Sequence, residues 1–371
     1  MATQNYTAEL WAAITAIQRA AKISRHVLLA TDKGQIQKDD LSPVTVADFA
    51  IQALLTRHLR YAFPEDGFIA EESADQLRDD VNLRQHVDDV IQQCDDDALP
   101  AASQPDLCDL IDLGSKPTPI GPDTGRVWVF DPIDGTKTFI RGEQYAINVA
   151  LIEDGIQVLS VVALPLLSMD AQAPLGNADI DPTGPEGGCI LYAVRGLGAR
   201  VIPLSFLGKD HGEAGRSLPR HCDAVTPESL SSGEEAATLR SVTCWNSLDS
   251  GVDDVHKAAT ESLGVPFPGC DLLGWVPRWS VLALGLANMT IWVYKRRDRC
   301  AKIWDHAGAM LLFEEVGGKI TDVHGNDIDL TRGRKLEANF GFVAAPKSVH
   351  HIVLKAVQET LKQQGKRGLL I

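Results

Sequence analysis

The stretch Arg126-Val-Trp-Val-Phe-Asp-Pro-Ile-Asp-Gly-Thr136 joins an apolar run to a turn that carries two carboxylates. Residues 126–130 form a short apolar run, which predicts a buried strand. Pro132 and Gly135 favour a turn, so Asp131 and Asp134 leave the strand close together. Such a turn can direct both carboxylates and an intervening carbonyl to one point, as Mg²⁺ requires. The stretch therefore predicts a metal site, with an Asp-rich capping turn as the alternative.

Carboxylates at three other places can extend this site. Glu71-Glu72-Ser73 follows an apolar, strand-like pair, and Asp305 opens a predicted helix after Ile303-Trp304. Asp48 lies at the start of another predicted helix, after Ser42-Pro-Val-Thr45. Each has an ordinary structural explanation as well. Asp305 alone can be a helix N-cap worth about 1 kcal/mol, and the Glu71-Glu72 pair can be a solvated turn.

Strand and helix signals recur along the whole chain. Asp154-Gly155 and Gly196-Leu-Gly198 separate β-rich runs and predict hairpins. The mixture favours α+β layers over a doubly wound parallel sheet. We expect a domain at 1–165 that carries most metal ligands and a domain at 166–371 that carries Asp305. Helices are predicted at 8–30, 46–61, 280–287, 304–316 and 348–363, and strands at 126–130, 145–152, 156–164, 190–194, 199–204, 290–294, 319–323 and 340–344.

Composition narrows the functional classes. The chain has 371 residues, 44% of them hydrophobic, and a formal net charge of −15, which argues against a nucleic-acid polymer or an anionic membrane as partner. No apolar run is long enough to cross a bilayer, and the N-terminal 28 residues read as an amphipathic helix rather than a secretory signal. Seven scattered cysteines without a CxxC pair predict reduced thiols and a cytoplasmic location.

The negative charge is concentrated in one segment. Between Glu65 and Asp112 there are 15 acidic residues and two basic ones. A run of this kind is typical of a solvated, partly mobile insertion, which we place at about 75–112.

The combination of motifs resembles the lithium-sensitive, magnesium-dependent phosphatase superfamily, which includes inositol monophosphatase and the 3′(2′),5′-bisphosphate nucleotidases. Three signatures stand in the family's order: Glu71-Glu-Ser73, Asp131-Pro-Ile-Asp-Gly-Thr136, and Trp304-Asp-His-Ala307 followed by Glu314-Glu-Val-Gly-Gly318. The resemblance spans roughly residues 8–360 and implies a layered α/β/α/β/α sandwich. The nucleotidase branch is the more similar, through Ser42-Pro-Val-Thr45, Thr136-Lys137, Arg141-Gly-Glu-Gln144 and Ala193-Val-Arg-Gly-Leu-Gly198.

The resemblance implies a role for each motif residue. Two or three Mg²⁺ ions would be held by Glu71, Asp131, the carbonyl of Ile133, Asp134 and Asp305. Thr136, together with Asp48, would orient and deprotonate the attacking water. The backbone N–H groups of Gly135-Thr136 and Asp305 would bind phosphate. Li⁺ would inhibit by occupying a weakly held metal position.

The substrate-facing region departs from the nucleotidase pattern. Where that branch has Ser-x-x-Lys-Tyr, this chain has Trp275-Val-Pro-Arg-Trp279, and a position that is usually Arg is Trp292. The tryptophans are either a core cluster or a wall that stacks on a base. Arg278 is the first candidate for binding a second phosphate because it keeps the positive charge. Lys295 and Arg296 are further candidates, unless their basic run is a solvated loop.

The sequence thus predicts a Mg²⁺-dependent phosphomonoesterase that acts on a small-molecule phosphate ester as a monomer or homodimer. The expected reaction is hydrolysis of 3′-phosphoadenosine 5′-phosphate to AMP and phosphate, with the sulfated form as a possible second substrate. One alternative is an inositol phosphate or another bulky, partly apolar monophosphate. A more distant one is a metal-binding pseudo-enzyme, which would have lost a ligand or the water-activating pair. The metal ligands and the water-activating pair are both present in this chain.

Overall fold

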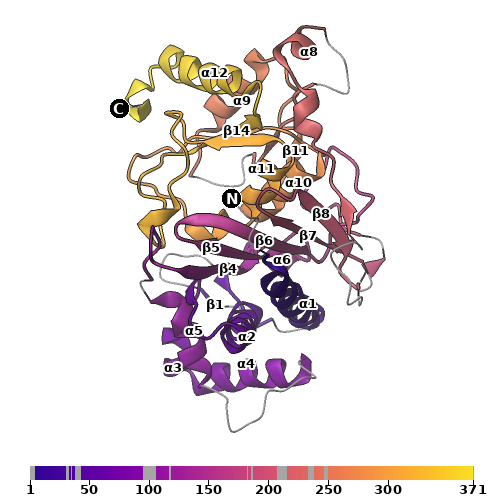
Figure 1. Ribbon diagram of the computed structural model, residues 1–371, viewed down its shortest axis with the longest axis vertical. Coiled ribbons are helices and arrows are strands. Elements are labelled where there is room, and N and C mark those ends of the chain that lie inside the picture. The colour runs from indigo at the N-terminus through magenta and orange to yellow at the C-terminus, as the bar shows by residue number, and fades with distance from the viewer. Residues whose placement is uncertain are drawn as a thin grey trace.

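The computed structural model describes residues 5–30, 33–34, 36–37, 43–94, 106–116, 118–181, 183–184, 187–206, 215–232, 238–245 and 250–370. Figure 1 shows the chain running from a helical layer at one end, through a large sheet, to a second helical end that contains the C-terminus.

A seven-stranded sheet forms the centre of the molecule, with strand order β3-β4-β5-β6-β7-β8-β9. Strand β3 pairs with β4 in parallel, and every later neighbour is antiparallel. Because β6 pairs with β7, the sheet continues past residue 165, the expected domain boundary. The strands are β3 (Gly67–Ala70), β4 (Arg126–Asp134), β5 (Ala146–Glu153), β6 (Ile156–Leu164), β7 (Cys189–Val194), β8 (Ala199–Pro203) and β9 (Arg216–Ser217).

Helices α1 (Thr7–Leu29) and α2 (Val46–Ala62) cover one face of this sheet. Both present apolar residues at helical spacing to the strands, and α2 begins with a capping box between Thr45 and Asp48. Helices α4 (Val81–Cys94) and α5 (Leu107–Ser115) pack against the outer side of α2.

The described part of the acidic segment is helical. Leu83, Val87, Val90 and Ile91 of α4 are buried in the same core as α1 and α2. Its acidic side chains face outward because the apolar positions recur at helical spacing. Residues 95–105 of the expected insertion lie outside the described residues.

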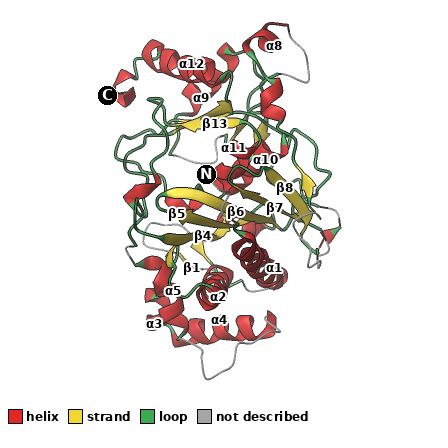
Figure 2. Cartoon of the chain, viewed as in Figure 1, coloured by secondary structure: helices red, strands yellow, loops and turns green. Residues whose placement is uncertain are grey.

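The opposite face of the large sheet is covered by α10 (Trp275–Leu284) and α11 (Ala309–Glu315). These helices separate it from a three-stranded sheet of order β12-β14-β13, and α12 (His350–Gln363) covers the far side (Figure 1). The layers alternate as helix, sheet, helix, sheet, helix, as Figure 2 shows by colour, so the predicted α+β sandwich is confirmed. The small sheet contains β12 (Thr290–Trp292), β13 (Gly318–Thr321) and β14 (Phe342–Pro346).

The remaining elements connect these layers. The helices are α3 (Asp75–Asp79), α6 (Thr136–Arg141), α8 (Pro227–Ser232) and α9 (Asp253–Ser262), and the short strands are β1 (Ile36–Gln37), β2 (Pro43–Val44), β10 (Val242–Thr243) and β11 (Cys270–Asp271). Among the described residues, no helix is long and apolar enough to span a membrane. All seven cysteines lie among the described residues, and no disulfide joins them there.

Two elements at the site differ from the sequence prediction. Strand β4 does not end at Phe130 but continues to Asp134, with a register shift between Asp131 and Asp134. The predicted helix over 304–316 is divided into a 3₁₀ turn, Ile303–Asp305, and α11. Hydrophobic periodicity does not distinguish a bulged strand from a turn, or a broken helix from a continuous one.

Candidate active site

Three carboxylates converge where β4 ends. Asp131 and Asp134 come from the bulged end of β4, and Asp305 comes from the 3₁₀ turn before α11. Each offers one oxygen atom, and these atoms lie within 4.8 Å of one another. Asp131 is only 1% exposed and Asp134 only 8%. The structure therefore brings Asp305 next to two acids of β4 from which it is far removed in sequence.

The electrostatics of this cluster favour a bound cation. Burial, followed by the charge of Glu71, raises the pKa of Asp131 well above its usual range. Burial and the charge of Asp134 do the same to the pKa of Asp305. Burial also raises the pKa of Asp134 to about 6, although a hydrogen bond from Val276 opposes the shift. Like charges that have lost their water are stabilised by a positive ion between them. Their oxygen-only donor set fits Mg²⁺.

The bulge in β4 explains how two acids of one strand reach the same point. Asp131 Oδ1 accepts a hydrogen bond from the backbone N–H of Ile133 at 3.0 Å. Gly135 then adopts φ 92°, and a Cβ there would lie 2.6 Å from Thr138 Oγ1. Only glycine therefore allows the chain to leave the bulge and begin α6.

Two contacts from the second half of the chain complete the cluster. The backbone N–H of Val276, in the first turn of α10, donates to Asp134 Oδ2 at 2.5 Å. Asn148 Nδ2 on β5 donates to the carbonyl of Trp304 at 2.7 Å. These hydrogen bonds hold α10 and the Asp305 turn against the large sheet.

Glu71 follows β3 and lines the cavity described below. Its backbone carbonyl accepts a hydrogen bond from Arg334 Nη2 at 3.2 Å. The next residue, Glu72, is held by Gln52 of α2, which accepts from the Glu72 N–H at 2.8 Å and donates to its carbonyl at 2.7 Å. Buried side-chain contacts thus position the Glu71-Glu72 turn, which is not the free solvated turn of the alternative interpretation.

The two residues expected to activate water are held by separate hydrogen bonds. The hydroxyl of Thr136 donates to the Ile133 carbonyl at 3.2 Å, the carbonyl that the resemblance assigns to a metal. Asp48 is fully buried, and its Oδ2 accepts from the N–H and hydroxyl of Thr45 at 2.8 and 2.7 Å. After burial and the nearer acids, Asp48 also contributes to the raised pKa of Asp131. Its charge is therefore part of this site.

Arg278 is buried beside the cluster, and its expected role in binding a second phosphate stays a prediction. Its side chain has no exposed area, and its guanidinium lies 3.5 Å from the ring of Trp275 and 4.9 Å from that of Trp292. Its Nε donates to the Gly274 carbonyl at 3.1 Å. Trp292 is also fully buried and Trp275 nearly so, as in the core-cluster alternative. Neither tryptophan lines the described cavity.

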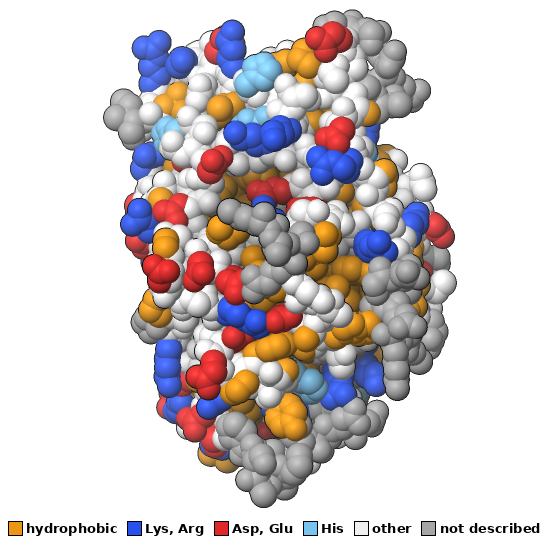
Figure 3. Space-filling view, in the orientation of Figure 1, with side chains coloured by type: hydrophobic (Ala, Val, Ile, Leu, Met, Phe, Trp, Pro, Cys, Tyr) orange, Lys and Arg blue, Asp and Glu red, His pale blue; other side chains and the backbone are white. Residues whose placement is uncertain are grey.

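Lys295 and Arg296 are also absent from the cavity lining. Both are exposed, and Arg296 forms an ion pair with Asp298. Figure 3 shows basic and acidic side chains interspersed over this face of the molecule, without a large area of one sign.

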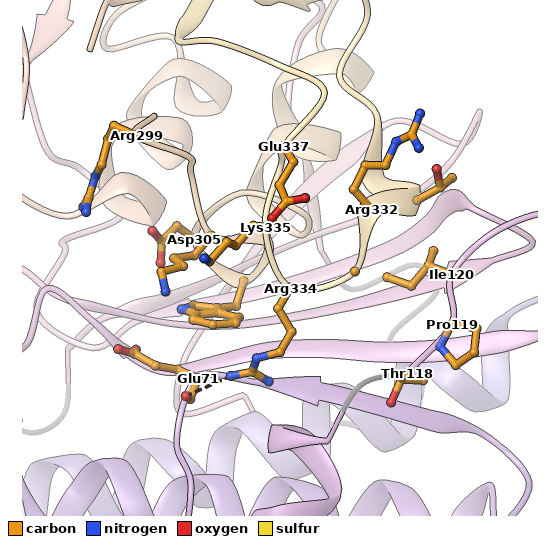
Figure 4. A pocket seen from close by; sticks show the side chains of 14 residues that line it. Glu71, Thr118, Pro119, Ile120, Arg299, Asp305, Arg332, Arg334, Lys335 and Glu337 are labelled. Carbon is orange, nitrogen blue, oxygen red and sulfur yellow. Dashed lines mark hydrogen bonds between the residues drawn. The ribbon is translucent and has the colours of Figure 1, made fainter. Parts of the chain in front are cut away.

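A cavity of about 880 Å³ opens beside Glu71 and Asp305 (Figure 4). Its basic side chains outnumber its acidic ones by five to three, although the protein is strongly acidic. Sequence reasoning missed most of these basic residues. The dense sequence Arg332-Gly-Arg-Lys335 could have drawn attention to them, but nothing in it reveals that it lies beside Asp305. The basic residues are Arg299, Lys302, Arg332, Arg334 and Lys335.

Comparison with known proteins agrees with this geometry. A profile of the inositol monophosphatase family matches residues 1–201 and 278–362. The 3′(2′),5′-bisphosphate nucleotidase of Emericella nidulans is 32% identical over 370 residues, covering 96% of this chain and 99% of that protein. The nucleotidase of the same name from Schizosaccharomyces pombe is also 32% identical, covering 95% of each chain.

Solved structures share the fold at lower identity. The Thermotoga maritima IMPase aligns with a TM-score of 0.55 at 17% identity, covering 96% of this chain and 98% of that one. An inositol monophosphatase from Anabaena aligns with a TM-score of 0.53 at 15% identity, covering 96% and 97%. The solved structures show the same fold, and the family profile and the curated relatives match nearly the whole chain. The chain therefore belongs to the inositol monophosphatase family.

Proposed function

We propose that this protein is a Mg²⁺-dependent 3′(2′),5′-bisphosphate nucleotidase that hydrolyses 3′-phosphoadenosine 5′-phosphate to AMP and phosphate. The observation that carries the phosphatase activity is the convergence of Asp131, Asp134 and Asp305 within 4.8 Å. The choice of substrate is supported by relatives of that name, which match nearly the full length of the chain.

The residues of the cluster would hold the metal. Asp131, Asp134 and Asp305, with Glu71 and the Ile133 carbonyl beside them, supply only oxygen atoms. When bound, Mg²⁺ would neutralise phosphate oxygens, stabilise the leaving oxygen and make water a better nucleophile. Two or three ions per site fit the number of carboxylates. A cytoplasmic monomer or homodimer remains our expectation for the intact protein.

The remaining chemistry belongs to Thr136 and Asp48. The Thr136 hydroxyl donates a hydrogen bond to the Ile133 carbonyl, so its oxygen is left to accept a hydrogen bond from water and fix the direction of that water. A threonine hydroxyl holds its proton too tightly to act as a base alone. Asp48, whose charge is felt at Asp131, is the carboxylate that would receive the proton.

One observation favours a second candidate. Trp275, Arg278 and Trp292 form a buried cluster where the nucleotidase pattern has polar residues. Because these residues are buried away from the described cavity, they offer a nucleotide none of the polar contacts of that pattern, which favours an inositol phosphate or another bulky, partly apolar monophosphate.

Phosphate release from a substrate panel tests both candidates. The panel contains 3′-phosphoadenosine 5′-phosphate, adenosine 3′-phosphate, inositol 1-phosphate, inositol 1,4-bisphosphate and fructose 1,6-bisphosphate, each with and without Mg²⁺. We expect Mg²⁺-dependent release with the highest kcat/KM for the adenosine bisphosphate. A higher kcat/KM for an inositol phosphate would replace the first candidate by the second. Absence of Mg²⁺-dependent release from the whole panel would refute both.

A further inference from the structure

Two lysines are held directly opposite one another at the edge of the active site. Lys302 and Lys335 are partners in an isolated antiparallel β-bridge. Flanking backbone hydrogen bonds secure this register, from Ile303 N to the Arg334 carbonyl at 3.1 Å and from Leu336 N to the Ala301 carbonyl at 3.0 Å. Side chains of residues directly opposite each other project from the same face of such a pair, and like charges there are destabilising.

No acidic side chain of the described residues compensates this pair by direct contact, and the one aromatic contact is that of Lys302 Nζ, 5.4 Å from the ring of Trp304. Neither Lys302 nor Lys335 makes an ion pair within 4.0 Å with any residue that the structure describes, whereas most basic side chains near them are engaged. Arg332 pairs with Asp329 at 2.9 Å. Arg334 donates to the carbonyls of Gly114 and Glu71 at 2.6 and 3.2 Å.

Two of the three acids that share the cavity are already required elsewhere, and the third, Glu337, is exposed and makes no ion pair within 4.0 Å with either lysine. Asp305 and Glu71 are the negative charges that act most strongly on Lys302, and both belong to the candidate metal site. If Mg²⁺ neutralised the charges of Glu71 and Asp305, these acids would no longer offset the positive charges of the two lysines. Figure 4 shows Arg299, Asp305 and Lys335 around the same space, so Arg299 adds a third basic group to it.

We propose that Lys302 and Lys335, with Arg299 at the rim, form a second anion subsite that binds the distal phosphate of a bisphosphate substrate. The scissile phosphate of that substrate would lie at Asp131, Asp134 and Asp305. This inference rests on the proposed phosphatase function and assigns to the lysine pair the role that the sequence suggested for Arg278.

The size and lining of the cavity support this assignment. At about 880 Å³ it is far larger than a phosphate group and has room for the body of a nucleotide or a cyclitol. Pro119 and Ile120 give part of its wall an apolar surface, against which such a body can pack. A phosphate dianion has several acceptor oxygens and can bridge two ammonium groups.

A matched pair of substrates isolates the subsite. Adenosine 3′-phosphate differs from 3′-phosphoadenosine 5′-phosphate only in lacking the distal phosphate. We expect Lys302→Gln and Lys335→Gln each to raise KM for the bisphosphate by about 10-fold or more, with KM for the monophosphate changed by less than about 2-fold. Lys355→Gln, which removes one positive charge from an exposed pair on α12, is the control and should alter neither value.

The same comparison separates this inference from the proposed function. If the wild-type enzyme instead prefers inositol 1,4-bisphosphate over inositol 1-phosphate, and the glutamine variants lose that preference, the subsite stands and the nucleotidase assignment fails. If it prefers the adenosine bisphosphate and the variants keep that preference, the nucleotidase stands and the subsite is refuted. A wild-type enzyme without preference for any bisphosphate over its monophosphate also refutes the subsite. Lys302→Arg and Lys335→Arg retain the charge and should retain the preference, which excludes misfolding as the cause.

Discussion

Asp131 interacts electrostatically with four other acids of the site. Glu71, Asp134, Asp305 and Asp48 all raise its pKa, after the larger effect of burial. The negative charge of this side chain attracts the metal ion, and the bound ion in turn neutralises that charge. Removing its charge is therefore more damaging than removing that of any peripheral acid.

Asp131→Asn should abolish turnover, with a loss in kcat of at least about 10³-fold, or ~4 kcal/mol. The amide keeps the shape of the side chain but removes an anion from the centre of the cluster. Mg²⁺ affinity, measured by isothermal titration calorimetry, should fall as well. Asp254→Asn, on an exposed ion pair with Lys366, is the charge-matched control. Retention of more than a tenth of wild-type kcat at saturating Mg²⁺ would contradict the assigned role.

Thr136→Ala should lower kcat by about 10²–10⁴-fold, the usual contribution of a positioned acid–base group. Because the Thr136 hydroxyl is bound to the Ile133 carbonyl rather than to a carboxylate, calorimetry should still detect Mg²⁺ binding. Thr136→Ser keeps the hydroxyl and should recover most of the rate. If Mg²⁺ affinity falls as steeply as kcat, the hydroxyl supports the bulge and does not orient water.

Elements distant in sequence hold the acidic turn after β3. Gln52, buried in α2, bonds the backbone of Glu72 through both of its polar atoms and also donates to the Ile111 carbonyl of α5 at 2.9 Å. One side chain thereby ties two helices to the strand end that presents Glu71. The geometry of the metal site depends on this element as well as on its ligands.

Gln52→Leu should lower the free energy of unfolding by about 2–5 kcal/mol, because it leaves a buried N–H and two carbonyls without their partner. It should also raise the Mg²⁺ concentration needed for half-maximal activity, since the Glu71 turn loses its support. Chemical denaturation and Mg²⁺ titration of activity measure the two effects. Gln85→Leu, on the exposed side of α4, is the control. An unchanged Mg²⁺ requirement would show that Gln52 acts on stability alone.

At the scale of the whole molecule, the cluster links folding to pH and metal. The folded-state pKa values of Asp131 and Asp305 lie well above their usual range, and that of Asp134 is about 6. The folded protein therefore holds protons that the unfolded chain releases from about pH 4 upward. Without metal, this contribution to stability is present at low pH and is lost as pH rises through about 6 and beyond.

Mg²⁺ should therefore raise Tm much more at pH 7.5 than at pH 5, because the carboxylates must lose their protons before they bind it. Differential scanning calorimetry with and without Mg²⁺ at each pH measures this increment. Burial lowers the pKa of His256 to about 3, which affects stability in the opposite direction. Subtracting the Tm without Mg²⁺ from the Tm with Mg²⁺ at the same pH removes this effect. In Asp134→Asn the increment should shrink at pH 7.5. An increment that does not change with pH would contradict this linkage.

The sequence by itself determined the parts of this protein that depend on neighbours along the chain. Asp131, Asp134, Asp305 and Glu71 could be selected because their motifs join acids to strand ends and helix starts, and the family and the layered fold followed from those motifs. The sequence did not show which side chains are buried or which distant residues become neighbours. Nothing local shows that the Arg278 guanidinium is enclosed by Trp275 and Trp292.

The basic groups show the same limit most clearly. Arg278, Lys295 and Arg296 drew attention because they lie near the motifs in sequence, but the structure buries the first and leaves the others outside the cavity. Lys302 and Lys335 are 33 positions apart and become neighbours through one β-bridge. Charge acts through space and not along the chain, so only the tertiary structure could decide which cations face the active site.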